Sequence, residues 1–215
     1  MTEAVIEEAA REGLNLVIAH HPLLFRGLKC VSDATQVERC VRLAIRHDIA
    51  LYAAHTNLDN AQGGVCHEMG HRLGLQEVEF LDPAPDGRSG SGIIGRLPQP
   101  MEAHTFLRQL KATFEVESLQ YAVARQQQVQ RIALCGGAGD FLIDRAIAAE
   151  ADLFLTGEIG YHRFFGHEND LWLAALGHYQ SERYTIDLME RIVHAAFPTL
   201  PIHKTRCNTN PIQYL

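Results

Sequence analysis

The sequence predicts an α/β fold in which two interlocked lobes are built on mostly parallel sheets. Short apolar runs alternate with amphipathic segments, and the order near the N-terminus is helix, strand, helix, strand. Several apolar runs end abruptly in polar or glycine residues, which is typical of strands that lead into loops at one edge of a parallel sheet. The stretch DPAPDGRSGSG, residues 82–92, is rich in turn-forming residues and predicts a lobe boundary.

Hydrophobic periodicity gives the elements of the first half. The helices expected there are Glu3–Arg11, Gln36–His47 and Gly64–Leu73, and the strands are Leu14–Ala19, Ile49–Ala54 and Val78–Leu81.

The second half continues the alternation. We expect helices at 102–114, from 140 to 149 and from 177 to about 196, and strands at 93–97, 119–124, 129–135, 152–155, 171–176 and 201–207. This order predicts one lobe that begins in residues 1–91 and is completed by residues 130–215, with residues 92–129 forming the second lobe.

Composition excludes several classes of protein. The net charge of −7 without a long basic run argues against a nucleic-acid-binding surface, and no apolar run has the length of a membrane span. The N-terminal segment is acidic and amphipathic, unlike a signal or transit peptide. Five scattered cysteines without a CxxC motif indicate reduced thiols, and hence a cytoplasmic protein.

Two adjacent histidines, His20 and His21, follow the apolar strand Leu14–Ala19 directly. Side chains alternate along a strand, so an isolated pair of this kind is more often one core and one solvated histidine. Pro22 ends the strand here, at an edge where α/β proteins build sites. The pair is therefore a candidate for metal binding if further ligands exist.

Such residues occur downstream. His178 and Glu182 are four residues apart on one face of a predicted helix, and Asp59 follows another strand. Imidazole and carboxylate together suit zinc, manganese or iron, and a carboxylate can bridge two ions. The five residues predict a metal site where strands end and helices begin.

Five blocks in this order, AHHPLLFRGLK, AAHTNLD, CGGAGDFLIDRA, LTGEIGYH and GHYQSE, resemble the family of NGG-one-interacting factor three. Bacterial members of that family are named GTP cyclohydrolase I type 2. The resemblance implies a dinuclear centre held by His20, His21, Asp59, His178 and Glu182, with one histidine of the pair on each ion and Glu182 bridging. His55, Glu158 and His162 match positions that line the same cavity.

The resemblance also implies an assembly, a homohexameric ring of dimers with its sites facing an inner cavity. Family members usually carry one more strand-helix unit before Glu3, and we expect this unit to be missing here.

Two classes of function follow. The first is a metal-dependent hydrolase acting on a small nucleotide-like substrate, in which His55, Glu158 or His162 moves a proton. Since His162 follows Glu158 by four residues, both can face the strand-end cavity if that turn is helical. The second class is a non-enzymatic metal-binding or partner-binding regulator.

A rival motif is HEMGH, residues 67–71, which matches the HExxH pattern of zinc metalloproteases. The position expected for a third histidine is occupied by Glu77, and Gly70 weakens the helix. We therefore expect this helix to be structural, with a metalloprotease as a remote alternative.

The glycine cluster 136–139 lies between a strand and a helix. It could present backbone N–H groups to a phosphate, or it could be a tight turn near the cavity. Cys135, which precedes it, is expected to be a small buried hydrophobe rather than a nucleophile.

Overall fold

The computed structural model describes all residues from Met1 to Leu215. The chain forms two compact units: unit 1 contains residues 1–57 and 189–215, and unit 2 contains residues 58–188. These divisions fall at other positions than the predicted lobe limits at 91 and 129, and the lobes stay a prediction.

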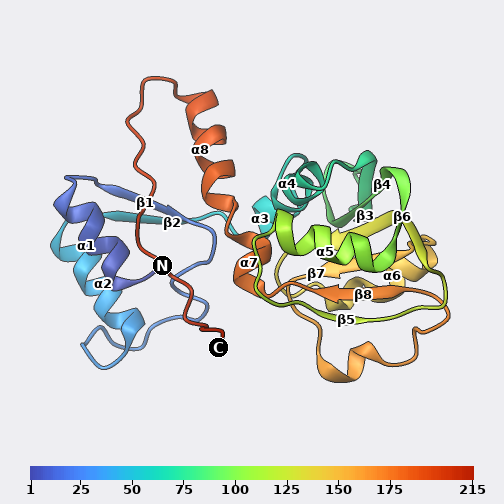
Figure 1. Ribbon diagram of the computed structural model, residues 1–215. Helices are drawn as coiled ribbons and strands as arrows, with labels where there is room; N and C mark the ends of the chain where they lie inside the picture. The colour runs from blue at the N-terminus through green and yellow to red at the C-terminus, as the bar shows by residue number, and fades with distance from the viewer. The chain divides into compact units, whose positions relative to one another are not determined.

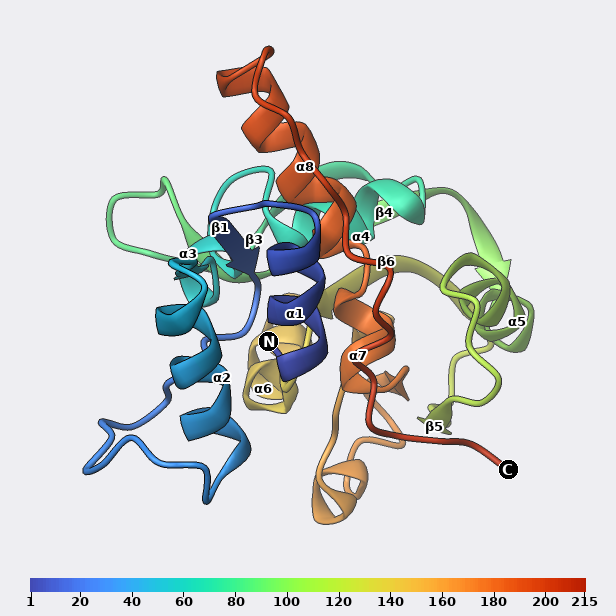
Figure 2. The ribbon, with the colours of Figure 1, turned by 90° about the vertical axis from the view of Figure 1, so that its left-hand side faces the viewer.

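Unit 1 is a βαβ arrangement preceded by one helix, and it also contains the helical residues 189–196 (Figures 1 and 2). Its elements before the C-terminal part are α1 (Glu3–Arg11), β1 (Leu16–Ala19), α2 (Gln36–Arg46) and β2 (Ala50–Ala53). Strands β1 and β2 are parallel, with Leu16 opposite Ala50 and Ala19 opposite Ala53. Helices α1 and α2 pack side by side and bury a core of small and aliphatic residues, which are Ile6, Ala9, Val17, Cys40, Ala44 and Ile49.

The last residues of the chain complete unit 1 without forming a strand. The predicted strand 201–207 is wrong, because this segment has no strand pairing. It is held instead by the carboxylate of Glu8 in α1, which accepts hydrogen bonds from the Thr205 hydroxyl, the backbone N–H of Arg206 and the ring of His203.

Unit 2 is organised around a six-stranded sheet in the order β3-β4-β6-β7-β8-β5. The strands are β3 (Gln76–Pro83), β4 (Gly90–Glu102), β5 (Gln120–Ala122), β6 (Gln128–Cys135), β7 (Leu153–Thr156) and β8 (Trp172–Ala175). Only the pairs β6-β7 and β7-β8 are parallel, whereas β3-β4, β4-β6 and β5-β8 are antiparallel. The expectation of mostly parallel sheets is therefore corrected, since the sheets are partly parallel and partly antiparallel.

Helices pack against this sheet and fill its core. They are α4 (Val65–Arg72), α5 (Ala103–Thr113) and α6 (Ile143–Ala148), preceded by the short α3 (Thr56–Asp59) and the turn η1 (Asp140–Leu142). Trp172, Phe106, Phe114 and Phe154 are fully buried. Each large side chain of this kind contributes about 1.5–3 kcal/mol when it is removed from water.

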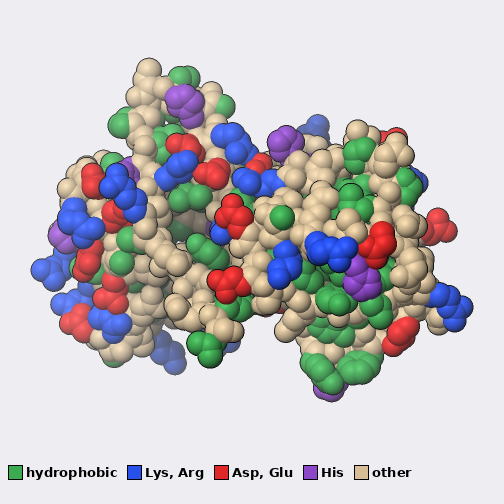
Figure 3. Space-filling view, viewed as in Figure 1, with side chains coloured by type: hydrophobic (Ala, Val, Ile, Leu, Met, Phe, Trp, Pro, Cys, Tyr) green, Lys and Arg blue, Asp and Glu red, His purple; other side chains and the backbone are tan.

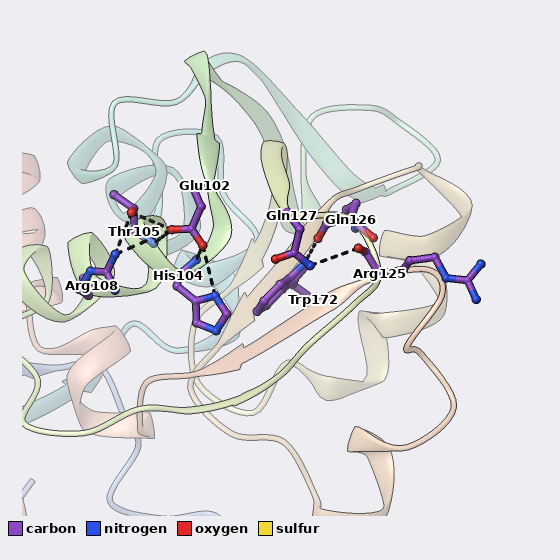
Figure 4. A network of polar contacts seen from close by, with 8 residues as sticks. All are labelled: Glu102, His104, Thr105, Arg108, Arg125, Gln126, Gln127 and Trp172. Carbon is purple, nitrogen blue, oxygen red and sulfur yellow. Dashed lines mark hydrogen bonds and ion pairs between the residues drawn. The ribbon is translucent and has the colours of Figure 1, made fainter.

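A polar network fixes the start of β8, the strand that leads to the candidate site (Figure 4). The indole N–H of Trp172 donates to the carbonyl of Gln126 at 2.7 Å, and the ring of His104 lies edge-on to the indole at 5.1 Å. Glu102 caps α5 by accepting from the backbone N–H groups of His104 and Thr105. The Thr105 hydroxyl, followed by these N–H groups, lowers the pKa of Glu102 to about 2.

Beyond β8 the chain forms two helices rather than the single long one predicted. These are α7 (His178–Glu182) and α8 (Thr185–Ala196). At the break, the Thr185 hydroxyl donates to the carbonyl of Glu182. None of the helices has the length and hydropathy that a membrane span requires.

Candidate metal centre

Three histidines gather at one edge of the β1-β2 sheet in unit 1. Because β1 and β2 are parallel, their C-terminal ends meet at the same edge, which places His20 and His21 beside His55. The ring centroids are 4.8 Å apart for His20 and His21, 5.4 Å for His20 and His55, and 5.2 Å for His21 and His55. One nitrogen from each ring lies within 4.8 Å of the others, so the cluster can hold a metal ion.

His20 is oriented for this task by the backbone. Its Nδ1 lies 2.8 Å from the carbonyl oxygen of Ala54, so Nδ1 carries the proton and Nε2 remains as the ligand atom. A metal-binding histidine commonly donates its second N–H to a carbonyl or carboxylate in this way. His20 is also buried, which limits its rotation.

In unit 2, β8 delivers a second set of ligand-type groups. Gly177, with φ of 99°, makes the sharp turn from β8 into α7. The Nε2 atom of His178 then lies 3.2 Å from Oε2 of Glu182, and its Nδ1 atom lies 3.2 Å from Oε1 of Glu158. Two ligands of one tetrahedral ion, each about 2.0–2.1 Å from it, are separated by about 3.3 Å. The spacing of His178 and Glu182 thus fits a shared ion, with Glu158 on the far nitrogen.

The carboxylates around His178 favour its protonated form when no cation is bound. The hydrogen bond with Glu182 raises the pKa of His178, and Glu158 adds to this shift against the opposing effect of burial. The Glu182 side chain is itself only 8% exposed. A cation would take the place of the proton that balances these charges.

The glycine turn after β6 holds the Glu182 carboxylate. A Cβ atom on Gly137 would lie 2.3 Å from Oε1 of Glu182 and 3.3 Å from Nε2 of His178, and Gly137 has φ of 61°. Both the positive φ and the close approach require glycine. The sequence pointed to this turn through its glycines but gave no sign that it receives Glu182.

Two of the backbone N–H groups in this turn are engaged within the protein and are not available to a phosphate. The N–H of Gly137 donates to the Ser181 hydroxyl at 3.0 Å, and the N–H of Gly139 donates to the Thr156 hydroxyl at 3.0 Å. These two N–H groups stabilise the turn and do not face a ligand. Ser181 and Thr156 are therefore residues that the sequence reasoning missed, although Ser181 stands inside the GHYQSE block.

Asp59 ends α3 in unit 2 and is half-buried.

Cys135 stays a neutral thiol. Its pKa is raised by the hydrogen bond with Cys66, by burial, and by the negative charges of Asp59 and Glu182. This agrees with the expected role of Cys135 as a small buried side chain.

Glu158 and His162 do not share a helical face, because residues 158–160 are not helical and η2 (Tyr161–Phe164) begins after them. Glu158 reaches His178, whereas His162 is exposed and its ring lies 5.3 Å from that of Tyr161. Glu158 and His162 therefore do not project from one helical turn, and the role of His162 stays a prediction.

The HEMGH segment forms part of α4, and its groups are engaged in packing. Glu68 forms an ion pair with Arg72 at 3.0 Å, and Arg72 stacks over the ring of Tyr184 at 3.7 Å. His67 packs edge-on against Phe80, and burial lowers its pKa, while His71 is exposed. This geometry favours the structural interpretation over the protease.

The chain is similar in sequence to known proteins from bacteria and from an animal. A Clostridium perfringens protein named GTP cyclohydrolase 1 type 2 homolog is 33% identical over 84% of this chain and 70% of its own length. A Lactococcus lactis protein of the same name is 33% identical over 97% of this chain and 80% of its own. The Drosophila melanogaster NIF3-like protein 1 is 29% identical over 85% of this chain and 63% of its own.

Solved structures share the fold. A hypothetical protein of Staphylococcus aureus superposes with a TM-score of 0.91 at 24% identity, covering all of this chain and 84% of its own. A Bacillus cereus protein related to NIF3 gives 0.84 at 22% identity over all of this chain and 87% of its own. The model of the Duf34/NIF3 (NGG1p interacting factor 3) family matches residues 1–211, and the chain belongs to this family.

Proposed function

We propose that the chain is a metal-dependent hydrolase that binds two divalent ions and acts on a small nucleotide-like substrate. The ligands are His20, His21, Asp59, His178 and Glu182, and their chemistry suits zinc, manganese or iron. The observation that carries the proposal is the row Glu158–His178–Glu182, in which a carboxylate lies 3.2 Å from each ring nitrogen. The names of the bacterial relatives support GTP as the first substrate to test.

The protein groups have separate tasks in this proposal. When bound, the two ions supply Lewis acidity that brings the pKa of water toward neutral. Glu158 holds the proton on Nδ1 of His178, so that Nε2 points toward the ligand position. The Ala54 carbonyl does the same for His20. His55 adds a third imidazole beside the histidine pair.

Metal content tests the ligand set. Elemental analysis should find about two ions in the wild-type chain and a large loss in Glu182→Ala, because no other carboxylate occupies the Gly137 turn. Glu68→Gln is the matched control, since Glu68 is also a helical carboxylate but pairs with Arg72. Equal metal content in wild type and Glu182→Ala would refute the proposal.

Turnover separates the hydrolase from a metal-binding regulator. The metal-loaded protein is incubated with GTP and the other nucleoside triphosphates, and products are separated by chromatography. Metal-dependent product supports the hydrolase. Full metal occupancy without any product would favour the regulator.

His162 is the proposed proton donor to the leaving group, since imidazole exchanges protons near neutral pH. His162→Ala should lower kcat about a hundredfold with metal content unchanged. His194→Ala, another exposed histidine, is the control. If added metal restores the rate of His162→Ala, the residue supports metal binding and does not donate the proton.

We also propose a homohexameric assembly and a cytoplasmic location. The assembly extends the family resemblance, whereas the location rests on the five scattered cysteines without a CxxC motif, which indicate reduced thiols.

A further inference from the structure

Two aromatic side chains project from the segment between β7 and β8. Tyr161 is 73% exposed and Phe165 is 58% exposed, although both are large and apolar. In Figure 1 this segment hangs below the sheet of unit 2, and Figure 3 shows hydrophobic side chains gathered at the same place. Exposed apolar side chains that contact one another mark a binding surface more often than single ones do.

The two rings form a corner with fixed geometry. Their centroids are 5.3 Å apart and their planes meet at 75°. A third flat ring can stack on one face of this corner and present its edge to the other ring, which are the two arrangements that aromatic rings prefer. A flexible aliphatic chain gains no such advantage, so the corner favours a planar ligand.

The corner is tied to the turn that holds Glu182. The N–H of Gly160 donates to Oδ2 of Asp140 at 3.1 Å, and the guanidinium of Arg163 donates to the Asp140 carbonyl at 2.9 Å. Asp140 directly follows the glycine turn. At the other end of the same turn, the N–H of Glu158 donates to the Gly137 carbonyl at 3.0 Å. One turn therefore fixes both Glu158, beside His178, and the aromatic corner.

From this geometry we infer that Tyr161 and Phe165 stack the base of the substrate. The ligand is the planar, nitrogen-rich ring of a nucleoside, and the inference rests on the proposed function for its nucleotide part. Tyr161 and Phe165 have no charge, so their two rings contact the ring of the ligand and not its phosphates. The same segment carries the carboxylates of Glu158 and Glu168 and one guanidinium, that of Arg163, which donates to the Asp140 carbonyl. Stacking is sequence-tolerant because every base has a π face.

Binding assays on the full-length, metal-loaded protein test this inference. The probes are GTP, guanosine and inorganic tripolyphosphate, measured by calorimetry. Tyr161→Ala should weaken GTP and guanosine binding about tenfold or more, and Tyr161→Phe should keep affinity within a few-fold. Tripolyphosphate binding and metal content should not change in either variant. Phe197→Ala, which removes a 62% exposed ring elsewhere, is the control and should have no effect.

Three results would overturn the inference. They are unchanged GTP affinity in Tyr161→Ala, equal weakening of GTP and tripolyphosphate, and a fall in oligomer mass in Tyr161→Ala, which would assign the corner to a protein interface. If GTP and guanosine bind through Tyr161 but no turnover occurs, the hydrolase proposal is refuted and the stacking site is supported. If GTP is turned over but Tyr161→Ala does not change the affinity for GTP, only the stacking site is refuted.

Discussion

At the scale of single residues, Gly137 is as informative as the ligands themselves. It offers no donor to a ligand, because Ser181 takes its N–H, and its missing side chain is what lets the Glu182 carboxylate approach. A ligand prediction that considers only histidines and carboxylates misses this kind of residue. The geometry of a metal site depends on the groups that hold the ligands.

Gly137→Ala should lower metal content strongly, since its Cβ would fall 2.3 Å from Oε1 of Glu182. An alanine at φ of 61° also strains the backbone, and this strain by itself could lower metal content. The control variant must therefore carry a similar strain. Gly74→Ala provides it, because Gly74 has φ of 68° and open space around its Cβ position. Elemental analysis of the two folded variants should show a loss for Gly137→Ala only. A similar loss in both would assign the effect to strain.

At the scale of elements, the sequence predicted local structure well where local interactions decide it. Helix α1 begins and ends where expected, at Glu3 and Arg11, because its periodicity and its terminal Gly13 are local signals. The turn from β8 into α7 was also placed correctly at Gly177. The candidate ligands His20, His21 and His178 are predicted from the same kind of local signal, since each lies shortly after an apolar strand, and their role as ligands stays a prediction.

The misses concern interactions between distant residues. The segment 201–207 has the composition of a strand but no strand to pair with, and pairing is a property of two segments. Strand β4 pairs with β6 and strand β8 pairs with β5, and both pairs are antiparallel. These strands are not consecutive in the sequence, and hydrophobic periodicity does not tell which strands pair or in which direction. The interruption after Glu182 is also unpredicted, since hydrophobic periodicity continues across the turn in which the Thr185 hydroxyl donates to the Glu182 carbonyl.

The C-terminal segment depends on one carboxylate for its attachment to α1. The Thr205 hydroxyl, followed by the N–H of Arg206, lowers the pKa of Glu8 to about 2, from about 4.5 in the unfolded chain. The ionised form is therefore the one that binds the segment. This stabilisation is complete above about pH 4.5 and is lost as the pH falls toward 2.

Glu8→Gln should release the segment at neutral pH. The neutral amide of glutamine lacks the negative charge that strengthens the hydrogen bonds which the Glu8 carboxylate accepts. Hydrogen exchange at residues 203–207 should become faster in this variant. Glu7→Gln, an exposed neighbour on the same helix, should exchange like the wild type. Unchanged protection in Glu8→Gln would show that other contacts hold the segment.

At the scale of the whole molecule, the chain has two units with different architectures. Unit 1 has a sheet of only two strands, whose stability depends on the helices packed against it, whereas unit 2 has six strands and most of the buried aromatic residues. We expect unit 2 to resist denaturant longer than unit 1 for this reason.

The proposed assembly has a direct test. Light scattering should give a particle mass near six times the chain mass of 24.0 kDa. Closed rings are common among homo-oligomers because every copy then makes the same contacts. A monodisperse particle of one chain mass at micromolar concentration would contradict the hexamer.

The clasp between Glu8 and residues 203–207 also sets an order of events during protein synthesis. Helix α1 leaves the ribosome early, but the groups that surround its interior carboxylate are translated almost 200 residues later. The unit that contains His20, His21 and His55 is therefore finished only after the whole of unit 2 has emerged and had time to fold. A nascent chain stalled before residue 203 would carry the three histidines on an unfinished unit, which delays completion of unit 1 until residues 203–207 have been translated.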